Sequence, residues 1–444
     1  MNGQTTKTME RKEFLKQTGL ILGSLPTLGS ASLTAASKSE ISTTYDPMSW
    51  SEIRDQFELR RSHIHMSTFL LSSHPKPVAE AIERHRNALD EDPAHYWEEH
   101  FMTAEPQQQA AAGEYLNANP DHIALTDSTT MGLGLVYGML KLRPGQEIVT
   151  TTHGHFSTDL SLKHRAERTK AKIRKISLYD NPAEASVDEI VSRAKSAITE
   201  QTRVIAVTWV HSSTGVKLPI KEIAQVLQEM NRSREMADRI LLCVDGVHGF
   251  GIENMRVDDL ECDFFIAGTH KWLFGPRGTG IIWGRDEAWE ALDPIIPNFG
   301  PSAGVWIGAL PVDTPLITPG NFFTPGGFHS FEHRWALAEA FRFHLDIGKE
   351  RVQERIHTLN TMTKEALAGM PHVQLHTPMS TELSSGLVCF DVDGYSPEQV
   401  VEEFHRHKIT ASTTPYRDSH ARLAPSLINN EEEVERTVEV IAKM

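Results

Sequence analysis

The sequence predicts an α/β protein with a large domain built on a mostly parallel sheet and a smaller C-terminal α/β domain. From about residue 120 to residue 300, short apolar segments alternate with amphipathic segments of helical period. This alternation is typical of parallel strands joined by crossover helices. A segment rich in glycine and proline, 299–328, then interrupts the alternation and separates the two domains.

Seven short apolar runs are the predicted strands of the large sheet, and they cover 123–126, 147–151, 172–177, 204–210, 240–244, 264–267 and 280–283. Helices are predicted between them over 187–198 and 220–230, where apolar residues recur at helical spacing. We therefore expect a large domain over 116–320, preceded by an N-terminal arm over 41–115 that contains a helix at 77–88.

The smaller domain is predicted over 321–444. It is expected to open with one long helix at 332–345, followed by strands near 373–377 and 386–392. An amphipathic last helix is expected to start at Glu431.

The composition is that of an ordinary globular chain. It has 444 residues, of which 39% are hydrophobic and 23% charged, so the chain is long enough for two cores. The net charge of −15 argues against nucleic acid or an anionic membrane as a partner. After the N-terminal region, no apolar run is long enough to span a membrane. Three cysteines lie in apolar, strand-like contexts and are expected to be core residues: Cys243, Cys262 and Cys389.

Residues 1–40 are predicted to be an export signal rather than part of the fold. A charged start at Arg11-Lys12 precedes a mildly apolar stretch that ends in small residues. The order Arg-Lys-x-Phe-Leu-Lys is similar to a twin-arginine signal whose second arginine is replaced by lysine. We therefore expect a periplasmic or exported bacterial protein, and the alternative is a disordered or lightly helical extension.

Lys271 is the residue that points most strongly to chemistry. It lies between an apolar strand and a Gly-Pro-Arg-Gly turn, where an amine loses hydration, lowers its pKa and can attack a carbonyl. Asp245 ends another apolar strand upstream. A lysine and a carboxylate at two strand ends are what pyridoxal phosphate requires, because the aldehyde bonds the amine and the pyridinium nitrogen pairs with the acid.

Four motifs in this order resemble the fold-type I pyridoxal-phosphate enzymes. The resemblance is specifically to the class V aminotransferase group, with its cysteine desulfurases and isopenicillin N epimerase-like members. The residues that carry it are Asp245-Gly246-Val247-His248, His270-Lys271 with the following Gly-Pro-Arg-Gly, Ser128-Thr129-Thr130, and Arg422-Leu423-Ala424-Pro425. The resemblance is specific for the cofactor and the fold, which we expect to be pyridoxal phosphate and fold type I. It is much less specific for the reaction.

The segment Ser128-Thr129-Thr130 follows a strand and opens an apolar helical run. Hydroxyls and free N–H groups at a helix N-terminus attract a phosphate, and a plain N-cap is the alternative. The resemblance implies that this loop holds the cofactor phosphate, with Thr129 and Thr130 at matching positions. His270 is expected to contact the phosphate as well, while Gly268 stands where desulfurases often carry a phosphate-binding serine.

Further positions follow from the resemblance. His153 takes the place of the ring that stacks on the pyridine, with His155 as the second choice, and His248 faces the cofactor's ring oxygen. A zinc site at His153 and His155 lacks a local third ligand, so no metal is predicted. Arg422 is implied to grip the substrate α-carboxylate, with a solvated surface arginine as the alternative. Ser212 and His155 are weaker candidates for the substrate pocket.

A missing cysteine narrows the choice of reaction. No cysteine lies between His405 and Arg422, where a desulfurase needs its mobile thiolate, so sulfur transfer is disfavoured. We expect aminotransferase or epimerase chemistry at the α-carbon of a small amino-acid-like substrate. The alternatives are a lyase or oxidative decarboxylase or deaminase that tailors a secreted peptide such as a siderophore, and an exported binding protein with a degenerate site.

The chain is expected to form a homodimer. The long segment 299–330 matches the part of the family that crosses to a neighbouring subunit, where Gly327, His329 and Ser330 are weak candidates for contacting the phosphate.

Overall fold

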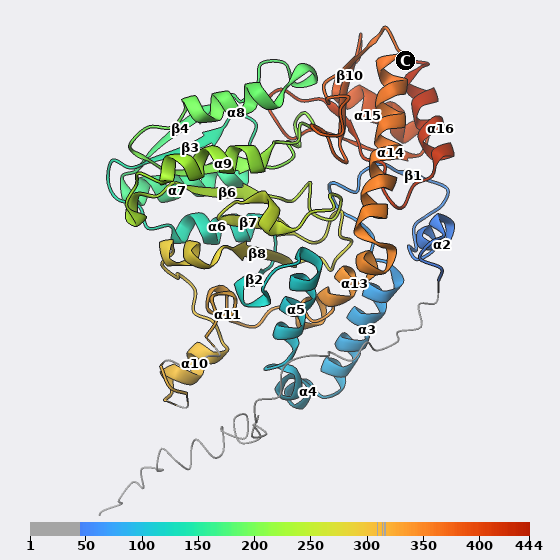
Figure 1. Ribbon diagram of the computed structural model, residues 1–444. Coiled ribbons are helices and arrows are strands. Elements are labelled where there is room, and N and C mark those ends of the chain that lie inside the picture. The colour runs from blue at the N-terminus through green and yellow to red at the C-terminus, as the bar shows by residue number, and fades with distance from the viewer. Residues whose placement is uncertain (1–44, 309, 313, 315–316) are drawn as a thin grey trace, which may run out of the picture.

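The computed structural model describes residues 45–308, 310–312, 314 and 317–444 (Figure 1). The predicted export signal, residues 1–40, lies outside these ranges. The large domain contains seven strands, which are β2 (Ile123–Thr126), β3 (Glu147–Thr151), β4 (Lys172–Ile176), β5 (Thr202–Thr208), β6 (Leu241–Asp245), β7 (Phe264–Gly268) and β8 (Gly280–Gly284). Their order is β2-β8-β7-β6-β5-β3-β4, and β8 runs antiparallel to both neighbours. The prediction of a mostly parallel seven-stranded sheet is confirmed.

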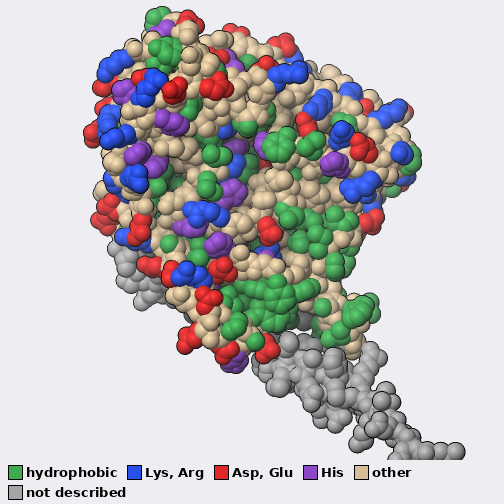
Figure 2. All heavy atoms as spheres, turned by 180° about the vertical axis from the view of Figure 1, so that it is seen from behind, with side chains coloured by type: hydrophobic (Ala, Val, Ile, Leu, Met, Phe, Trp, Pro, Cys, Tyr) green, Lys and Arg blue, Asp and Glu red, His purple; other side chains and the backbone are tan. Residues whose placement is uncertain are grey.

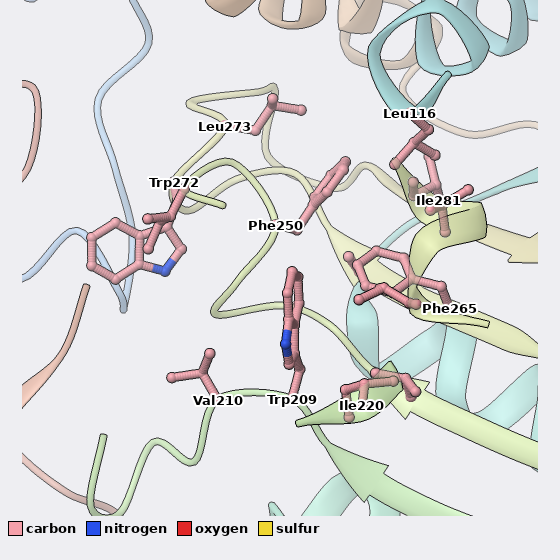
Figure 3. Close-up of a cluster of buried hydrophobic side chains, with 14 of the residues drawn as sticks. Leu116, Trp209, Val210, Ile220, Phe250, Phe265, Trp272, Leu273 and Ile281 are labelled. Atoms are coloured by element: carbon pink, nitrogen blue, oxygen red, sulfur yellow. The ribbon is translucent and has the colours of Figure 1, made fainter. Parts of the chain in front are cut away.

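Both faces of this sheet are buried, because successive side chains of a strand point to opposite faces. Leu242 and Val244 of β6 join one core with helices α5 (Ala104–Leu116), α8 (Val187–Ser196) and α9 (Ile220–Asn231). Leu241 and Cys243 join the opposite core with α6 (Thr129–Met139) and α7 (Phe156–Thr169). Figure 3 shows part of the first core, where Trp209, Phe250 and Phe265 lie close together.

The smaller domain is built on a four-stranded antiparallel sheet. Its order is β12 (Ser412–Thr413), β13 (Ala421–Leu423), β10 (Val388–Val392) and β9 (Val373–Leu375). Helices α14 (Lys349–Ala368), α15 (Pro397–Arg406) and α16 (Glu431–Ile441) contribute further residues to its core. Figure 1 shows α14 as a long helix that runs from α13 to this domain.

The predicted single helix over 332–345 is wrong. Two helices occupy this region, α12 (Phe331–Arg334) and α13 (Leu337–Ile347), and buried Trp335 and Ala336 separate them. Gly348 then adopts a φ of 91°, which favours glycine, and it lies between the end of α13 and the start of α14. The 20-residue α14 was not predicted.

The N-terminal arm divides between the two domains. Its strand β1 (Ile64–His65) joins the small domain and pairs in parallel with β11 (Ile409–Thr410), whereas Ile53 of α2 (Trp50–Arg54) is buried in the first core of the large domain. Its later helices α3 (Lys76–Glu91), α4 (Pro93–His100) and α5 belong with the large domain, where α3 and α5 pack against α13. The predicted helix at 77–88 therefore lies within α3.

The remaining elements are short. They are α10 (Pro301–Trp306), α11 (Pro319–Phe323) and the 3-10 helices η2 (Pro120–His122), η3 (Pro182–Glu184), η4 (Met236–Asp238), η5 (Val257–Leu260) and η6 (Asp286–Ala291). Within the described ranges, no helix combines the length and the apolar character that crossing a bilayer requires.

Candidate active site

A cavity of about 110 Å³ is formed where the large sheet's parallel strands end and the helices that follow begin. Open α/β sheets bind ligands at this carboxyl edge. The lining residues are Ser128, Thr129, Thr130, Leu133, His155, Ser157, Thr208, Ser212, Asp245, Val247, His248, His270 and Lys271. His153 and Arg422 are missing from this lining, as are the weaker candidates Gly327, His329 and Ser330.

Lys271 and Asp245 face the same cavity from two neighbouring strand ends. Burial lowers the pKa of the Lys271 amine, the positive charge of Arg422 lowers it further, and Asp245 opposes the shift. Burial also raises the pKa of Asp245, which the backbone N–H of Val247 and the charge of Lys271 counteract. The site therefore holds an amine that deprotonates more readily than a free lysine beside a carboxylate that is ready for a positive partner.

The orientation of His248 is determined by a neighbouring indole. Trp272 donates its ring N–H to His248 Nδ1 at 3.3 Å, and an indole nitrogen can only donate. In neutral His248 the proton is therefore on Nε2, which lies 3.4 Å from Lys271 Nζ. Burial holds the pKa of His248 well below its ordinary value, with contributions from the positive charges of Lys271 and Arg422. His248 consequently presents an N–H donor to the cavity.

The N-terminus of α6 supplies polar groups to the same cavity. Ser128 is the N-cap, and its Oγ accepts from the backbone N–H of Met131 at 3.1 Å. Thr130 Oγ1 lies 3.1 Å from Ser157 Oγ at the start of α7. The first turns of α6 and α7 thus bring the hydroxyls of Thr130 and Ser157 together at the cavity, and a helix N-terminus suits an anion.

Thr129 explains the glycine at position 268. The backbone N–H of Gly268 donates to Thr129 Oγ1 at 2.7 Å. A Cβ on residue 268 would lie 2.9 Å from the same oxygen and 3.1 Å from a carbon of the His270 ring. The threonine hydroxyl therefore occupies the space into which a side chain at position 268 would project.

The structure places the two histidines after β3 differently and favours His155, the second choice, over His153. His155 lines the cavity, whereas His153 lies outside the lining and stacks on Tyr179, with the ring centroids 4.2 Å apart. His155 is the N-cap of α7, and its Nδ1 accepts from the backbone N–H of Ser157. This cap holds the ring at the cavity, and burial lowers its pKa to about 4, with smaller contributions from Lys271 and Arg422.

Arg422 lies behind the cavity wall and is not a surface arginine. It is 5% exposed, and its guanidinium carbon lies 3.8 Å from the centroid of the Phe69 ring. One of its nitrogens donates at 3.2 Å to the carbonyl of Ser212, which does line the cavity. Its buried Nε has no hydrogen-bond partner among the described residues. The guanidinium can therefore bind a further acceptor.

Two polar residues that line the cavity were not among the predicted site residues. Ser157 and Thr208 line the cavity, and Thr208 ends β5, so the strand-end rule applied to the other residues would have found it. Tyr416 reaches the cavity wall from the small domain, where its hydroxyl lies 2.6 Å from Ser212 Oγ. Gly327 and His329 line a different cavity, with Phe101 and Trp335.

These residues fit pyridoxal phosphate. The amine of Lys271 can bond the aldehyde and Asp245 can pair with the pyridinium nitrogen. His248 offers a donor for the ring oxygen, His155 offers a flat neutral ring, and the α6 N-terminus with Thr129 and Thr130 suits the phosphate.

Comparison with solved structures supports the fold. A lysine-to-alanine variant of C-DES with glycine covalently linked to its PLP cofactor superposes with a TM-score of 0.78 at 21% identity, covering 88% of this chain and 99% of that one. A complex of the cystine C-S lyase C-DES with its reaction product cysteine persulfide gives a TM-score of 0.75, covering 86% and 98%. These likenesses establish the fold, and the cofactor of this chain is pyridoxal phosphate.

Proteins similar to this chain in sequence include an epimerase and a probable cysteine desulfurase. Isopenicillin N epimerase of Streptomyces clavuligerus is 23% identical over 88% of this chain and 97% of its own length. A probable cysteine desulfurase of Halalkalibacterium halodurans is 26% identical over 64% of this chain and 65% of its own. The model of the aminotransferase class-V family matches residues 72–416. The chain is therefore a member of the aminotransferase class V family of pyridoxal-phosphate enzymes.

Proposed function

We propose that this enzyme acts at the α-carbon of an amino acid or an amino-acid-bearing metabolite, by transamination or epimerisation. The observation that carries the proposal is the combination of Lys271, Asp245 and buried Arg422 around one cavity, whose described lining contains no cysteine. The relative named isopenicillin N epimerase, matched over 97% of its length, supports the same class of reaction.

Sulfur transfer is the activity that the site supports least. The 414–420 loop ahead of Arg422 contains Tyr416 and no cysteine. Cys389 is buried within β10, and burial raises the pKa of its thiol to about 12, although the charge of Arg422 opposes the shift. A protonated, enclosed thiol cannot serve as the mobile nucleophile that a desulfurase requires.

Bound pyridoxal phosphate supplies an electron sink for negative charge that develops at the substrate α-carbon. Asp245 would keep the pyridine nitrogen protonated, and the His248 Nε2–H would donate to the ring oxygen beside the aldehyde-bearing carbon. Lys271 first holds the cofactor and then moves the α-proton with its amine. Arg422 binds the substrate carboxylate, and this contact fixes which bond of the α-carbon is broken.

We also propose that the enzyme is a homodimer. The segment around α10 exposes Trp306 and Val312, which are 85% and 83% accessible, and Phe328 beyond it is 76% accessible. Figure 2 shows hydrophobic side chains gathered on one face of the molecule. Large exposed apolar patches mark association surfaces, so we infer that a second copy covers this face and brings Gly327 or His329 toward the partner's phosphate site.

The cellular location is also a proposal. The Arg-Lys-x-Phe-Leu-Lys start and the small residues before residue 40 support export of a folded, cofactor-loaded protein. An exported location favours a secreted metabolite or peptide as substrate, and it keeps lyase or oxidative decarboxylation chemistry as the second candidate. Fractionation of cells that express the full chain, compared with an Arg11→Lys variant, tests the route.

The reaction is tested by incubating the enzyme with amino acids and small peptides in heavy water. Label at the α-carbon without keto-acid release identifies an epimerase, whereas keto acid with conversion of the cofactor to its amine form identifies an aminotransferase. Carbon dioxide release identifies the decarboxylase alternative. No reaction with any amino-acid-like compound, in a protein that holds the cofactor, refutes the proposal and favours a binding protein.

A further inference from the structure

The small-domain sheet has one apolar face and one polar face. Val388, Phe390 and Val392 of β10 point into the small-domain core. Because side chains alternate along a strand, Cys389 and Asp391 point to the other face. The register pairs Cys389 with Arg422 and Phe390 with Ala421, so Asp391 lies opposite His420, one position further along.

Three potential metal ligands converge on this polar face. His376 Nε2 lies 2.7 Å from one oxygen of Asp391, and His420 Nδ1 lies 3.0 Å from each of its oxygens. The two imidazole centroids are 3.9 Å apart, and one ligand atom from each residue lies within 4.8 Å of the others. The three residues come from separate parts of the chain: the loop after β9, the strand β10, and the residue before β13.

We propose that His376, Asp391 and His420 bind one divalent transition-metal ion of the zinc type, with water completing the coordination. Two imidazole nitrogens and a carboxylate are common zinc ligands, and three protein ligands leave a position for water. The groups are accessible to an ion, because their side chains are 12%, 16% and 35% exposed for His376, His420 and Asp391.

Binding of such an ion changes the hydrogen bonds among the three residues. A bound ion needs bare His376 Nε2 and His420 Nδ1, which moves each ring proton to the other nitrogen. Those other nitrogens make no hydrogen bond within the described chain, so they can donate to water after the change.

The site lies at the base of the loop that carries Tyr416. The backbone N–H of Thr414 donates to the carbonyl of His420 at 2.9 Å, and His420 returns its N–H to Thr414 Oγ1 at 3.0 Å, closing the 414–420 loop. Tyr416 in this loop contacts Ser212 at the active-site wall. A bound ion therefore fixes both ends of the loop against β10 and holds Tyr416 in place, which is a structural role.

The test uses untagged holoenzyme that has been treated with a chelator and then titrated with zinc chloride in a calorimeter. One zinc ion per chain is expected, and cobalt chloride should give the absorption of a low-symmetry, nitrogen- and oxygen-bound ion. Loss of a residue that only hydrogen-bonds to a metal ligand weakens metal binding about 10- to 100-fold. Asp391→Asn and His420→Asn remove a ligand itself, so each should weaken zinc binding by more than this. His407→Asn is the matched control, because His407 pairs with Glu403 at 3.2 Å on an exposed helix end and belongs to no such cluster within the described part of the chain.

The absence of saturable uptake in the wild-type protein, or undiminished uptake in both variants, overturns the site. Circular dichroism and cofactor absorbance show whether the variants are folded. Hydrogen exchange of peptides covering 411–423 tests the role in the loop. Zinc should slow exchange there in the wild type and in His407→Asn, but not in Asp391→Asn. Unchanged exchange on zinc binding overturns the structural role.

Discussion

Replacement of Gly268 by alanine tests the account of the phosphate end of the cavity. The new Cβ would lie 2.9 Å from Thr129 Oγ1, closer than real Cβ contacts come, and 3.1 Å from the His270 ring. Overpacking of this kind costs about 1–3 kcal/mol of folding free energy. Thr129→Ala alone leaves the Gly268 N–H without its 2.7 Å acceptor, and an unpaired buried donor costs about 1–3 kcal/mol.

The two changes should not be additive. With Thr129 already replaced by alanine, the closest contact of the Gly268→Ala methyl group is gone. With Gly268→Ala in place, the threonine hydroxyl has already been displaced from its hydrogen bond. We therefore expect the double variant to be more stable than the sum of the single effects predicts, by at least about 1 kcal/mol. Urea denaturation of the apoenzyme measures the free energies, and fluorescence titration with pyridoxal phosphate measures the cofactor affinity.

Gly134→Ala is the matched control within the same helix. A Cβ there meets nothing closer than Ser161 Oγ at 3.8 Å. This substitution should stabilise α6 by about 0.5–1 kcal/mol. Its effect should add to that of Thr129→Ala within about 0.5 kcal/mol. Additivity of the Gly268 and Thr129 substitutions within the same limit would show that the threonine does not fill the space in front of residue 268.

Four further outcomes are expected. Lys271→Ala should abolish turnover and the absorption of covalently held cofactor, which absorbance before and after borohydride treatment checks. Arg422→Lys should raise KM for the substrate far more than it lowers kcat, because a lysine loses the planar two-point contact with a carboxylate; steady-state kinetics separate the two constants. His155→Ala should weaken cofactor binding while His153→Ala chiefly destabilises the fold, and the reverse pattern in titration and melting experiments would contradict the positions described for the two rings. The rate at which apoenzyme captures the cofactor should rise with pH, because the neutral amine of Lys271 is the reactive form. The midpoint of this rise should lie below the ordinary pKa of lysine, since burial and the charge of Arg422 lower the pKa of Lys271. Stopped-flow absorbance follows this rate, and a midpoint at the ordinary lysine value would contradict that environment.

The large sheet could be predicted because each strand is a short apolar run that is buried on both faces. The predicted 147–151 coincides with β3, and 264–267 differs from β7 only by Gly268. The break between α12 and α13 could not be predicted, because it depends on where the Trp335 side chain is buried. Trp335 stacks on His100, which lies more than two hundred residues earlier in the chain.

Some site residues could likewise be predicted from the local sequence, whereas others depend on tertiary contacts. Asp245 and Lys271 could be found because strand ends in a parallel sheet meet at one edge. The choice between His153 and His155 could not be made, since it depends on which of the two caps α7. The contact of Tyr416 with Ser212 joins residues of different domains, and no local pattern indicates it.

The pairing of β1 with β11 has a consequence for how this protein is made. Ile64 lies beside Ile409, and Arg54 of α2 binds Glu433 of α16 at 2.8 Å. A ribosome must therefore synthesise almost the whole chain before the segment that follows the N-terminal forty-four residues can find its partners. Contacts between such distant residues form late and slow the completion of folding. Folding is then completed only after the chain leaves the ribosome, when the N-terminal and C-terminal segments can pair.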